Sequence, residues 1–454
     1  MADYAKIFKA YDIRGVVPDD LDENAAEAVG AAFVRLTGAP GVVTAYDMRA
    51  SSPGLAAAFA RGAAAQGADV ISAGLGSTDL LYYASGSLGL PGAMITASHN
   101  PARYNGIKLC RAGARPVGAE TGLREIQEMV AGGIPAHSGL PGTVTERDLL
   151  SGYAAHLRTL VDLSGIRPLK VVVDAGNGMA GYTVPTVFDG LPIETVPLYF
   201  ELDGNFPNHE ANPIDPRNLA DLQRAVTSAG ADLGLAFDGD ADRCFVVDER
   251  GEIVSPSVLT ALIAVRELGR EPGAAIIHNL ITSRAVAEIV TAHGGRPVRT
   301  RVGHSFIKAQ MAAEGAVFGG EHSGHFYFRD FWFADSGMLA AMHVLAALGS
   351  GPRPLSELLA EYSRYVATGE INSEVADQAA TTARIRAAFA GRPGLATDDL
   401  DGLTVSAPDW WFNVRPSNTE PLLRLNAEAA DAATLAGIRD EVLQIITGDP
   451  SADR

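Results

Sequence analysis

The chain has 454 residues, of which 47% are hydrophobic and 20% are charged. At about 150 residues per domain, this length predicts three or four domains, and the apolar content is enough for each to bury a core. The formal net charge of −18 at pH 7 excludes broad binding to nucleic acid, because contacts with a phosphate backbone require a basic surface.

The N-terminal residues and the two cysteines predict the compartment. Residues 1–6 lack the basic start and apolar core of a secretion signal, and no run of about 18 apolar residues predicts a membrane span. Cys110 and Cys244 are far apart and lack metal-ligand spacing, which favours a reducing compartment. We therefore expect a cytoplasmic protein with no membrane partner. No sequence pattern indicates an oligomeric state.

The predicted elements repeat one layout three times. Each repeat opens with a short apolar strand, and these strands occupy residues 42–45, 170–173 and 275–277. A helix-compatible stretch and a second strand follow, and the second strands occupy residues 69–72, 193–198 and 297–301. The third strands, which run into polar loops, occupy residues 92–97, 232–237 and 316–318. Strands that alternate with helices predict parallel sheets.

The chain from about residue 367 has a different pattern. A strand precedes an Ala-rich helix near residues 379–389, two strands follow within residues 403–414, and residues 432–446 form a closing helix. We therefore expect an α/β protein with three similar mixed α/β domains in tandem and a C-terminal α+β domain. The predicted boundaries are 1–145, 146–250, 251–366 and 367–454. Since ligands bind beyond the carboxyl ends of strands in open sheets, the three polar loops are expected to converge.

Asp238, Asp240 and Asp242 stand at positions i, i+2 and i+4 of a loop between two apolar runs. Three close carboxylates repel one another unless a cation lies among them, and hard oxygen ligands suit Mg²⁺. An EF-hand is one alternative, since Glu249 falls at its twelfth position. However, Arg243 replaces the glycine of the sixth position, and the flanking segments are predicted strands. A solvated acidic turn is the other alternative.

Ser98 follows the third strand of the first repeat. His99 is its neighbour, but the chain has no Gly-x-Ser-x-Gly elbow, and an adjacent residue is poorly placed to act as a base. The pattern therefore disfavours a serine hydrolase, and Ser98 considered alone is typical of a turn hydroxyl or a helix cap. Lys108 is a candidate proton donor or acceptor if it is desolvated beside Ser98, with an ordinary surface lysine as the alternative.

Residues 176–181 match Gly-x-Gly-x-x-Gly after the strand at residues 170–173, and Glu194 follows at about the spacing of a ribose-binding acid. This motif supports a second hypothesis, a nicotinamide-dependent oxidoreductase. Glycines at a strand-to-helix turn also serve purely steric roles, however. The hypothesis leaves Ser98 and the aspartate loop without a task.

Residues 319–325 and 415–421 form two further loops rich in hydrogen-bonding side chains. His322 and His325 resemble metal ligands, yet their spacing from Glu321 matches no zinc signature. Glu, Ser and His side chains on a Gly-rich loop are better suited to sugar hydroxyls, with a purely structural loop as the alternative. The second loop, Arg-Pro-Ser-Asn-Thr-Glu-Pro, carries donors that suit a phosphate.

Together these motifs resemble those of the α-D-phosphohexomutase family over nearly the whole chain. Residues 96–108, with Thr-Ala-Ser-His-Asn-Pro and Asn-Gly-Ile-Lys, are similar to the family's active-site serine motif. Residues 238–243 resemble its metal loop, residues 320–325 its sugar-binding loop and residues 415–421 its phosphate-binding loop. The segment 9–15 resembles the family's opening motif, whose arginine faces the active site. Four motifs in the family's order make the resemblance specific.

The resemblance implies four domains around a central active-site cleft, and a hexose phosphate as the substrate. A phosphorylated Ser98 gives its phosphoryl group to the sugar phosphate, and the bound 1,6-bisphosphate returns its other phosphate to Ser98. The implied metal is Mg²⁺, with Ser98, Asp238, Asp240 and Asp242 as its ligands. Glucose 1,6-bisphosphate or mannose 1,6-bisphosphate is the implied activator.

By the same resemblance, Lys108 is the general base or acid, and His325 and Arg14 assist proton transfer. The residues implied to bind the substrate are Tyr11, His99, Arg243, His304, Glu321, Ser323, Arg415, Ser417, Asn418, Thr419 and Arg424. The cations among them are expected to concentrate positive potential in the cleft of an acidic protein.

Two features bear on the substrate. Some bacterial members carry a lysine after the first strand of the third domain, where this chain has His278-Asn-Leu-Ile-Thr-Ser-Arg284, and His304 and Lys308 are candidates to replace it. Asn418 is similar to the phosphomannomutase and phosphoglucomutase branch, whereas the phosphoglucosamine branch tends to have Gly. We expect mannose phosphates first and glucose phosphates also, because these sugars differ only at C2. A sugar-phosphate sensor is a third hypothesis, and the intact serine and lysine count against it.

Overall fold

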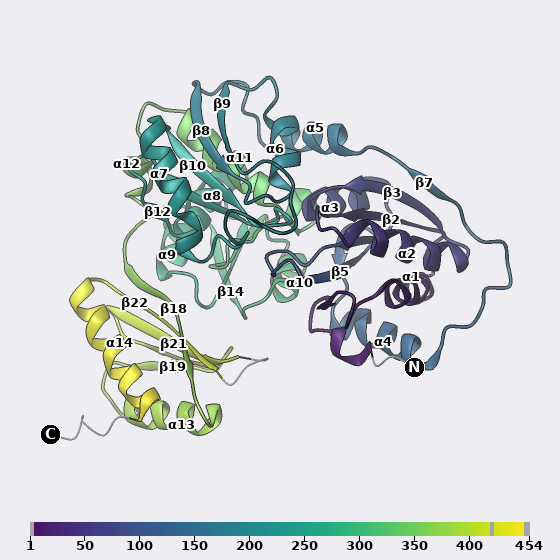
Figure 1. The fold of residues 1–454 in the computed structure, drawn as a ribbon. Helices are drawn as coiled ribbons and strands as arrows, with labels where there is room; N and C mark the ends of the chain where they lie inside the picture. Colours follow the sequence, from purple (N-terminus) through teal and green to yellow (C-terminus); the bar gives the residue numbers. More distant parts are fainter. Residues whose placement is uncertain (1–3, 418–421, 449–454) are drawn as a thin grey trace.

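The computed structural model describes residues 4–417 and 422–448, except for the side chains of residues 304 and 305. Within these residues the strands form four sheets, each packed against helices (Figure 1). The first three sheets and their helices lie together, and the C-terminal sheet forms a separate lobe. None of the described helices is long and apolar enough to cross a membrane.

The first unit contains a seven-stranded sheet. Its strands are β1 (Ile13–Val16), β2 (Gly41–Tyr46), β3 (Asp69–Leu75), β4 (Gly92–Ile95), β5 (Tyr104–Arg111), β6 (Arg115–Pro116) and β7 (Val144–Glu146). The order is β1-β5-β4-β2-β3-β7, with β6 beside β5. Strands β4, β2, β3 and β7 are parallel, and β5 and β1 are antiparallel to their neighbours. Its helices are α1 (Glu23–Thr37), α2 (Ser52–Ala65), α3 (Thr78–Leu88) and α4 (Arg124–Gly132), with short helical turns at Tyr4–Ile7 and Ala119–Leu123.

The second unit has the order β12-β11-β10-β8-β9. Its strands are β8 (Leu169–Asp174), β9 (Ile193–Leu198), β10 (Leu233–Phe237), β11 (Cys244–Asp248) and β12 (Ile253–Val254). Its helices are α5 (Leu150–Leu160), α6 (Ala180–Phe188) and α7 (Ala220–Ala229), with a short 3-10 helix at Pro216–Leu219. Strands β8, β9 and β10 are parallel, and β11 and β12 are antiparallel to their neighbours.

The third unit has the order β14-β13-β15-β16-β17. Its strands are β13 (Ala275–Asn279), β14 (Arg296–Thr300), β15 (Phe318–Gly320), β16 (Phe326–Phe328) and β17 (Ala334–Asp335). Its helices are α8 (Pro256–Arg270), α9 (Arg284–Ala292), α10 (His304–Glu314), α11 (Gly337–Gly349) and α12 (Leu355–Leu359), with a 3-10 helix at Arg329–Phe331. Strands β13, β14 and β15 are parallel, and β16 and β17 are antiparallel.

The three sheets share one topology, as the repeated layout predicted. In each, the first strand of the parallel set lies between the second and the third, and an antiparallel fourth strand follows the third. The polar loops begin after β4, β10 and β15, at the carboxyl ends of the third strands, where ligands bind in open α/β sheets. The prediction of three similar α/β domains is confirmed.

The C-terminal unit is an antiparallel sheet with two helices. Its strands are β18 (Val366–Glu374), β19 (Ala396–Asp398), β20 (Leu403–Ser406), β21 (Trp410–Pro416) and β22 (Leu422–Ala429), in the order β18-β22-β21-β20-β19. Helices α13 (Gln378–Phe389) and α14 (Ala432–Thr447) pack against the sheet. The predicted α+β character of this unit is confirmed.

One hydrophobic core runs through the first three units and holds their loops in fixed relation. The largest cluster of buried apolar side chains among the described residues includes residues from β4, β8, β10 and most of α11. Helix α11 is apolar on nearly every face, as a helix enclosed by protein must be. Cys110 in β5 and Cys244 in β11 are buried free thiols.

The third strand of the third unit lies later than the sequence predicted. Residues 316–318 were the expected strand, whereas β15 is Phe318–Gly320. Its last glycine is needed because α8 packs closely against it: a Cβ at Gly320 would lie 2.4 Å from Thr260 Oγ1. Glycines are depleted in strands, so the residue types alone did not indicate this part of β15.

Candidate active site

Ser98 follows β4 in a strained backbone conformation. Its φ of 51° lies in the left-handed region, which non-glycine residues adopt only when their surroundings impose it. The backbone N–H of Ser98 donates to Thr96 Oγ1 at 2.9 Å, and the side-chain hydroxyl donates to Asp238 Oδ2 at 2.8 Å. Ser98 is 5% exposed. The hydroxyl is thus aimed at the aspartate loop of the second unit.

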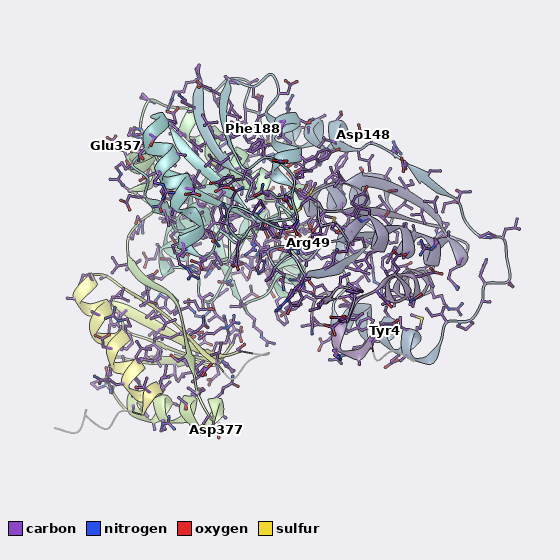
Figure 2. The ribbon with its side chains drawn as sticks, viewed as in Figure 1. Tyr4, Arg49, Asp148, Phe188, Glu357 and Asp377 are labelled. Carbon is purple, nitrogen blue, oxygen red and sulfur yellow. The ribbon has the colours of Figure 1, made fainter. Side chains whose placement is uncertain are left out.

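Arg49 donates hydrogen bonds to the backbone of the loop that carries Ser98. Its Nη2 donates to the backbone oxygens of Ser98 at 2.8 Å and Asn100 at 2.7 Å, and its Nη1 donates to those of Pro101 and Tyr104, both at 3.0 Å. The guanidinium is buried, and Figure 2 places Arg49 where the first unit meets its neighbours. An arginine with this many carbonyl acceptors fixes the loop backbone from Ser98 to Tyr104.

The three predicted metal ligands lie together after β10. Asp238, Asp240 and Asp242 are each at most 1% exposed, and one carboxylate oxygen from each lies within 4.8 Å of the other two. Ala241 has a φ of 59°, and this left-handed residue turns the loop so that the alternate side chains converge. The loop joins the antiparallel strands β10 and β11 rather than two helices, so the EF-hand alternative is wrong.

The aspartate loop fits a hard divalent cation. Oδ1 of Asp240 and Oδ1 of Asp242 are buried and make no hydrogen bond within the described part of the chain. Burial raises the pKa of Asp238 to about 8, and the charges of Asp242 and Asp240 add to this rise while Arg243 opposes it. Buried carboxylate oxygens without donors are the ligands that Mg²⁺ takes in proteins.

Lys108, on β5, reaches across to this loop. Its Nζ lies 2.6 Å from Asp240 Oδ2 and 2.7 Å from Asp242 Oδ2. Burial opposes the charged form of Lys108, but the two carboxylates outweigh burial and raise its pKa. The carboxyl of Asp240 is correspondingly held ionised, because Lys108 lowers its pKa against the effect of burial. Lys108 therefore stands in this arrangement as a cation on the carboxylate cluster.

Three further predicted residues surround Ser98. Arg243 Nε donates to Asp238 Oδ2 at 2.9 Å, and its Nη2 is buried without a hydrogen bond within the described residues. His99 Nδ1 lies 3.1 Å from Ser98 Oγ, and burial together with nearby Arg243 and Arg14 lowers the pKa of His99 well below its usual value. Arg14, on β1, donates from Nη1 to Asn100 Oδ1 at 2.6 Å. Two arginines thus flank a neutral histidine beside the nucleophile.

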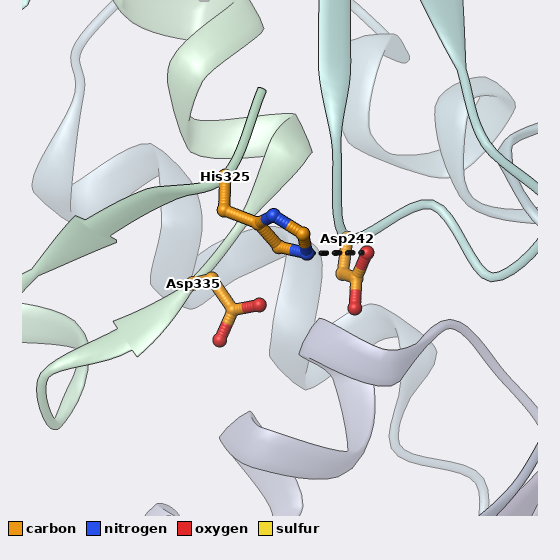
Figure 3. Close-up of side chains that lie close together, drawn as sticks. All are labelled: Asp242, His325 and Asp335. Carbon is orange, nitrogen blue, oxygen red and sulfur yellow. Dashed lines mark ion pairs between the residues drawn. The ribbon is translucent and has the colours of Figure 1, made fainter. Parts of the chain in front are cut away.

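The loop after β15 contributes His325 and Ser323. The imidazole Nε2 of His325 lies 3.7 Å from Asp242 Oδ1, and its Nδ1 lies 2.9 Å from Ser323 Oγ. Figure 3 shows the imidazole lying between Asp242 and Asp335, with Nε2 facing Asp242. The third unit thus places His325 beside the aspartate loop of the second unit.

Glu321 is held rigidly at the start of the same loop. It is 2% exposed, and Tyr327 Oη donates to its Oε1 at 2.6 Å. Asn279 Nδ2 and the backbone N–H of Gly303 lie 3.1 and 3.3 Å from its Oε2. Tyr11, from the first unit, lies nearby, since burial and the charge of Glu321 raise the pKa of its phenol.

The C-terminal unit brings two arginines side by side. Arg415 on β21 pairs in register with Arg424 on β22. Glu370 lies 3.2 Å from Arg415 Nη2 and 3.6 Å from Arg424 Nη1. Arg415 Nη1 and Arg424 Nε are buried without hydrogen bonds within the described residues, which is the donor arrangement of an anion site. Ser417 lies buried at the base of this loop.

Some of the residues predicted for the site are not described in the structure, and others make contacts elsewhere. Asn418, Thr419 and the side chain of His304 are among the undescribed parts. Lys308, considered as a replacement for the missing substrate lysine, is 4% exposed and forms an ion pair of 2.6 Å with Asp335. Lys308 therefore neutralises a buried carboxylate inside the third unit. Arg284 docks the C-terminal unit, because it donates to backbone oxygens of residues 407, 408 and 410.

The Gly-x-Gly-x-x-Gly segment makes close contacts with protein backbone. A Cβ at Gly178 would lie 2.7 Å from the carbonyl oxygen of Gly239 in the aspartate loop, and a Cβ at Gly181 would lie 2.3 Å from that of Phe200. The N–H of Met179 donates to the Gly239 oxygen at 2.9 Å. Protein backbone fills the space that a pyrophosphate would need, so the oxidoreductase hypothesis is wrong. Gly178 instead allows close packing on the aspartate loop, and Gly181 allows close packing on Phe200.

Sequence reasoning missed two residues that hold the site. Arg49 is one, although Asp47-x-Arg49 follows β2, and the rule that places ligands at strand ends would have found it. Thr78 is the other, with its hydroxyl 2.6 Å from Asp240 Oδ2. Nothing in its sequence neighbourhood indicates this contact, because 162 residues separate the two partners.

Models of the four phosphoglucomutase/phosphomannomutase domains match the chain in order. The alpha/beta/alpha domains I, II and III match residues 5–134, 151–251 and 255–365, and the C-terminal domain matches residues 370–445.

Individual proteins match over the same span. The phosphomannomutase of Salmonella montevideo is 40% identical over 449 residues, which cover 97% of this chain and 98% of the relative. Phosphohexose mutases of Xanthomonas campestris pv. campestris are 41% identical over 444 residues, with coverage of 97% and 99%. The crystal structure of a phosphoglucomutase/phosphomannomutase family protein from Burkholderia thailandensis aligns with a TM-score of 0.89 and 35% identity over 99% of both chains.

Fold, site and relatives together define a phosphohexomutase, an isomerase that relocates a phosphoryl group. The chain belongs to the phosphoglucomutase/phosphomannomutase family. The resemblance inferred from the four sequence motifs is confirmed.

Proposed function

We propose that the protein is a phosphomannomutase that interconverts mannose 1-phosphate and mannose 6-phosphate, and that it also accepts the corresponding glucose phosphates. The observation that carries the proposal is the 2.8 Å hydrogen bond from Ser98 Oγ to Asp238 Oδ2, which sets a nucleophile at the edge of a buried carboxylate cluster. The relatives' names, phosphomannomutase and phosphohexose mutases, favour mannose with a wider range of hexoses.

The metal site is part of the proposal. Asp238, Asp240, Asp242 and a phosphate on Ser98 would hold Mg²⁺, which when bound neutralises charge on the transferred phosphoryl group. The support is the donor set, since two of the buried carboxylate oxygens make no hydrogen bond within the described residues. The cytoplasmic location expected from the sequence is supported by two free cysteines.

In the first half-reaction the bond between phosphorus and Ser98 Oγ breaks, while phosphorus bonds to the free hydroxyl oxygen of the hexose phosphate. The sugar hydroxyl loses its proton, and Ser98 Oγ gains one. Lys108 is the proposed proton donor to Ser98 Oγ, and the carboxylates of Asp240 and Asp242 keep it in the charged form that carries the proton. His325, with Arg14, is the proposed group on the side of the sugar hydroxyl.

The second half-reaction is the reverse with the bisphosphate turned around. Its other phosphate passes to Ser98, and the isomeric monophosphate leaves. The phosphate that does not react is proposed to lie against Arg415 and Arg424, with Ser417, Asn418 and Thr419 beside it. Arg415 Nη1 and Arg424 Nε, both without hydrogen-bond partners within the described residues, support this assignment.

Sugar recognition is assigned to the loop after β15. Glu321 and Ser323 are proposed to bind sugar hydroxyls, with Tyr11, His99, Arg243 and His304 as further substrate contacts. Tyr327 and Asn279 fix the Glu321 carboxylate, so it presents a preorganised acceptor. Mannose and glucose share their hydroxyls at C3 and C4, so a site that contacts mainly these positions accepts both sugars.

The test is a mass measurement followed by an assay. The purified protein is treated with glucose 1,6-bisphosphate, mapped by peptide mass spectrometry, and assayed with Mg²⁺ on mannose 1-phosphate and glucose 1-phosphate. We expect phosphate on Ser98, formation of both 6-phosphates, and a higher kcat/KM for mannose 1-phosphate. The ratio of the two values decides the sugar.

Two variants complete this test. Ser98→Ala should lose turnover while an exposed control, Ser87→Ala, keeps it. Near-normal turnover in Ser98→Ala would overturn the mechanism. A Ser98 that the bisphosphate cannot phosphorylate, together with absent turnover in the unmutated protein, would instead support a sugar-phosphate sensor.

A further inference from the structure

The N-terminus of α3 contacts the metal loop across the boundary between the first and second units. Thr78 Oγ1 donates to Asp240 Oδ2 at 2.6 Å, and the Thr78 backbone N–H donates to the Asp240 carbonyl oxygen at 3.0 Å. Thr78 and Asp240 are fully buried. Thr78, from the first unit, therefore hydrogen-bonds both the side chain and the backbone of Asp240, a proposed metal ligand.

The start of α3 has little freedom to move. Ser77 caps the helix by accepting from the N–H of Leu80 at 3.3 Å. The buried carboxylate of Asp79 accepts from Tyr153 Oη at 2.7 Å and from Ser336 Oγ at 2.6 Å. Tyr153 lies on α5 of the second unit and Ser336 caps α11 of the third. Contacts to all three units thus fix the position of the Thr78 hydroxyl.

The contact determines which oxygen of Asp240 is available. Oδ2 accepts from two donors, Thr78 Oγ1 and Lys108 Nζ, both at 2.6 Å. Oδ1 is buried without a hydrogen bond within the described residues. The two donors therefore fix the rotation of the carboxylate and leave Oδ1 as the oxygen for coordination.

We propose that Thr78 is a positioning residue that orients the Asp240 carboxylate for the metal ion. Because Thr78 belongs to the first unit, the Mg²⁺ affinity of the aspartate loop then depends on the contact between the first and second units. The proposal rests on the metal site of the proposed function. Partners that hydrogen-bond a metal-ligating carboxylate orient it, and their loss typically weakens metal affinity about 10- to 100-fold. Coupling is reciprocal, so bound Mg²⁺ also stabilises the docked first unit.

The test compares Thr78→Val with Thr78→Ser. Valine keeps the branched shape and the backbone N–H of threonine but removes the hydroxyl, whereas serine keeps the hydroxyl. Thr381→Val, at a buried threonine of α13 in the C-terminal unit, is the matched control. Mg²⁺ affinity is measured by calorimetry and by displacement of Mn²⁺ followed by electron paramagnetic resonance. Circular dichroism checks folding, and Thr78→Ala replaces the valine variant if that variant does not fold.

We expect Thr78→Val to bind Mg²⁺ about 10- to 100-fold more weakly, with serine restoring most of the loss and Thr381→Val unchanged. Turnover of the valine variant should recover at high Mg²⁺, because the reacting groups remain. Unchanged Mg²⁺ affinity in the valine variant, or an equal loss in the serine variant, would overturn the proposal. Failure of the unmutated protein to bind Mg²⁺ would instead contradict the metal site itself.

Discussion

Replacement of Arg49 by methionine tests how strongly the serine loop depends on one buried guanidinium. Methionine keeps much of the length and volume of arginine but has no donors. The variant leaves four loop carbonyls without their donor and removes the partner of Asp47, which lies 3.2 Å from Arg49 Nε. Both side chains of the pair are at most 1% exposed, so water cannot replace the lost interaction without opening the fold.

The expected cost is large. Removal of one partner from a buried ion pair typically costs about 3–5 kcal/mol. At a urea dependence of about 1–3 kcal/mol per M, a loss of about 3–5 kcal/mol should lower the unfolding midpoint by about 1–5 M. The measurement is urea unfolding followed by circular dichroism. Arg61→Met is the control, because Arg61 is 53% exposed and pairs with Glu23 and Glu27 at the surface, where the loss should stay within about 0.5 kcal/mol.

The pH dependence of the variant identifies the cause. Burial raises the pKa of Asp47, and Arg49 is the main group that lowers it. Without Arg49 the folded variant holds a proton on Asp47 to higher pH than the unfolded chain does. The variant's stability therefore falls as pH rises, and its deficit should be smaller at pH 5 than at pH 8. A loss below 1 kcal/mol, or one equal to that of Arg61→Met, would refute the reasoning.

Three further predictions concern packing and charge. Gly178→Ala should raise the Mg²⁺ concentration needed for activity, measured by titration, because its Cβ would lie 2.7 Å from the Gly239 oxygen. Lys308→Met should lower the unfolding free energy by about 3–5 kcal/mol, measured in urea, because it removes the cation paired with buried Asp335. Burial raises the pKa of Asp79 from 3.8 to about 6, so stability should fall by about 3 kcal/mol as pH rises through this range, and Asp79→Asn should remove this slope in pH-dependent unfolding.

The sequence predicted the three-fold repeat because apolar strands end abruptly in polar loops. The apolar run at residues 232–237 and the three aspartates that follow it indicated the aspartate loop, which begins at the carboxyl end of β10 as expected from the sequence. The late position of β15 was not predictable, because close packing explains its glycines: Gly320 faces Thr260 of α8, and Gly319 faces Ile307 and Met311 of α10.

The sequence did not predict the site residues whose partners lie far away along the chain. Lys308 looked like a substrate lysine because it lies close in sequence to a predicted loop, yet the orientation of α10 turns it to Asp335. The sequence around Thr78 did not indicate its contact with Asp240, since Asp240 lies 162 residues away in another unit. Residues that act directly on a ligand carry recognisable chemistry, whereas residues that hold them acquire their role only from the fold.

The two buried thiols are natural probes of solvent access to the interior beside the site. Cys110 lies two residues after Lys108 on β5, and Cys244 lies two residues after Asp242 at the start of β11. Burial raises the pKa of both thiols, so neither reacts readily in the closed molecule. The labelling rate of each cysteine therefore reports how often the strand beside Lys108 or Asp242 is exposed to solvent. A ligand that stabilises the contact between the two strands would slow both rates, without any engineered probe.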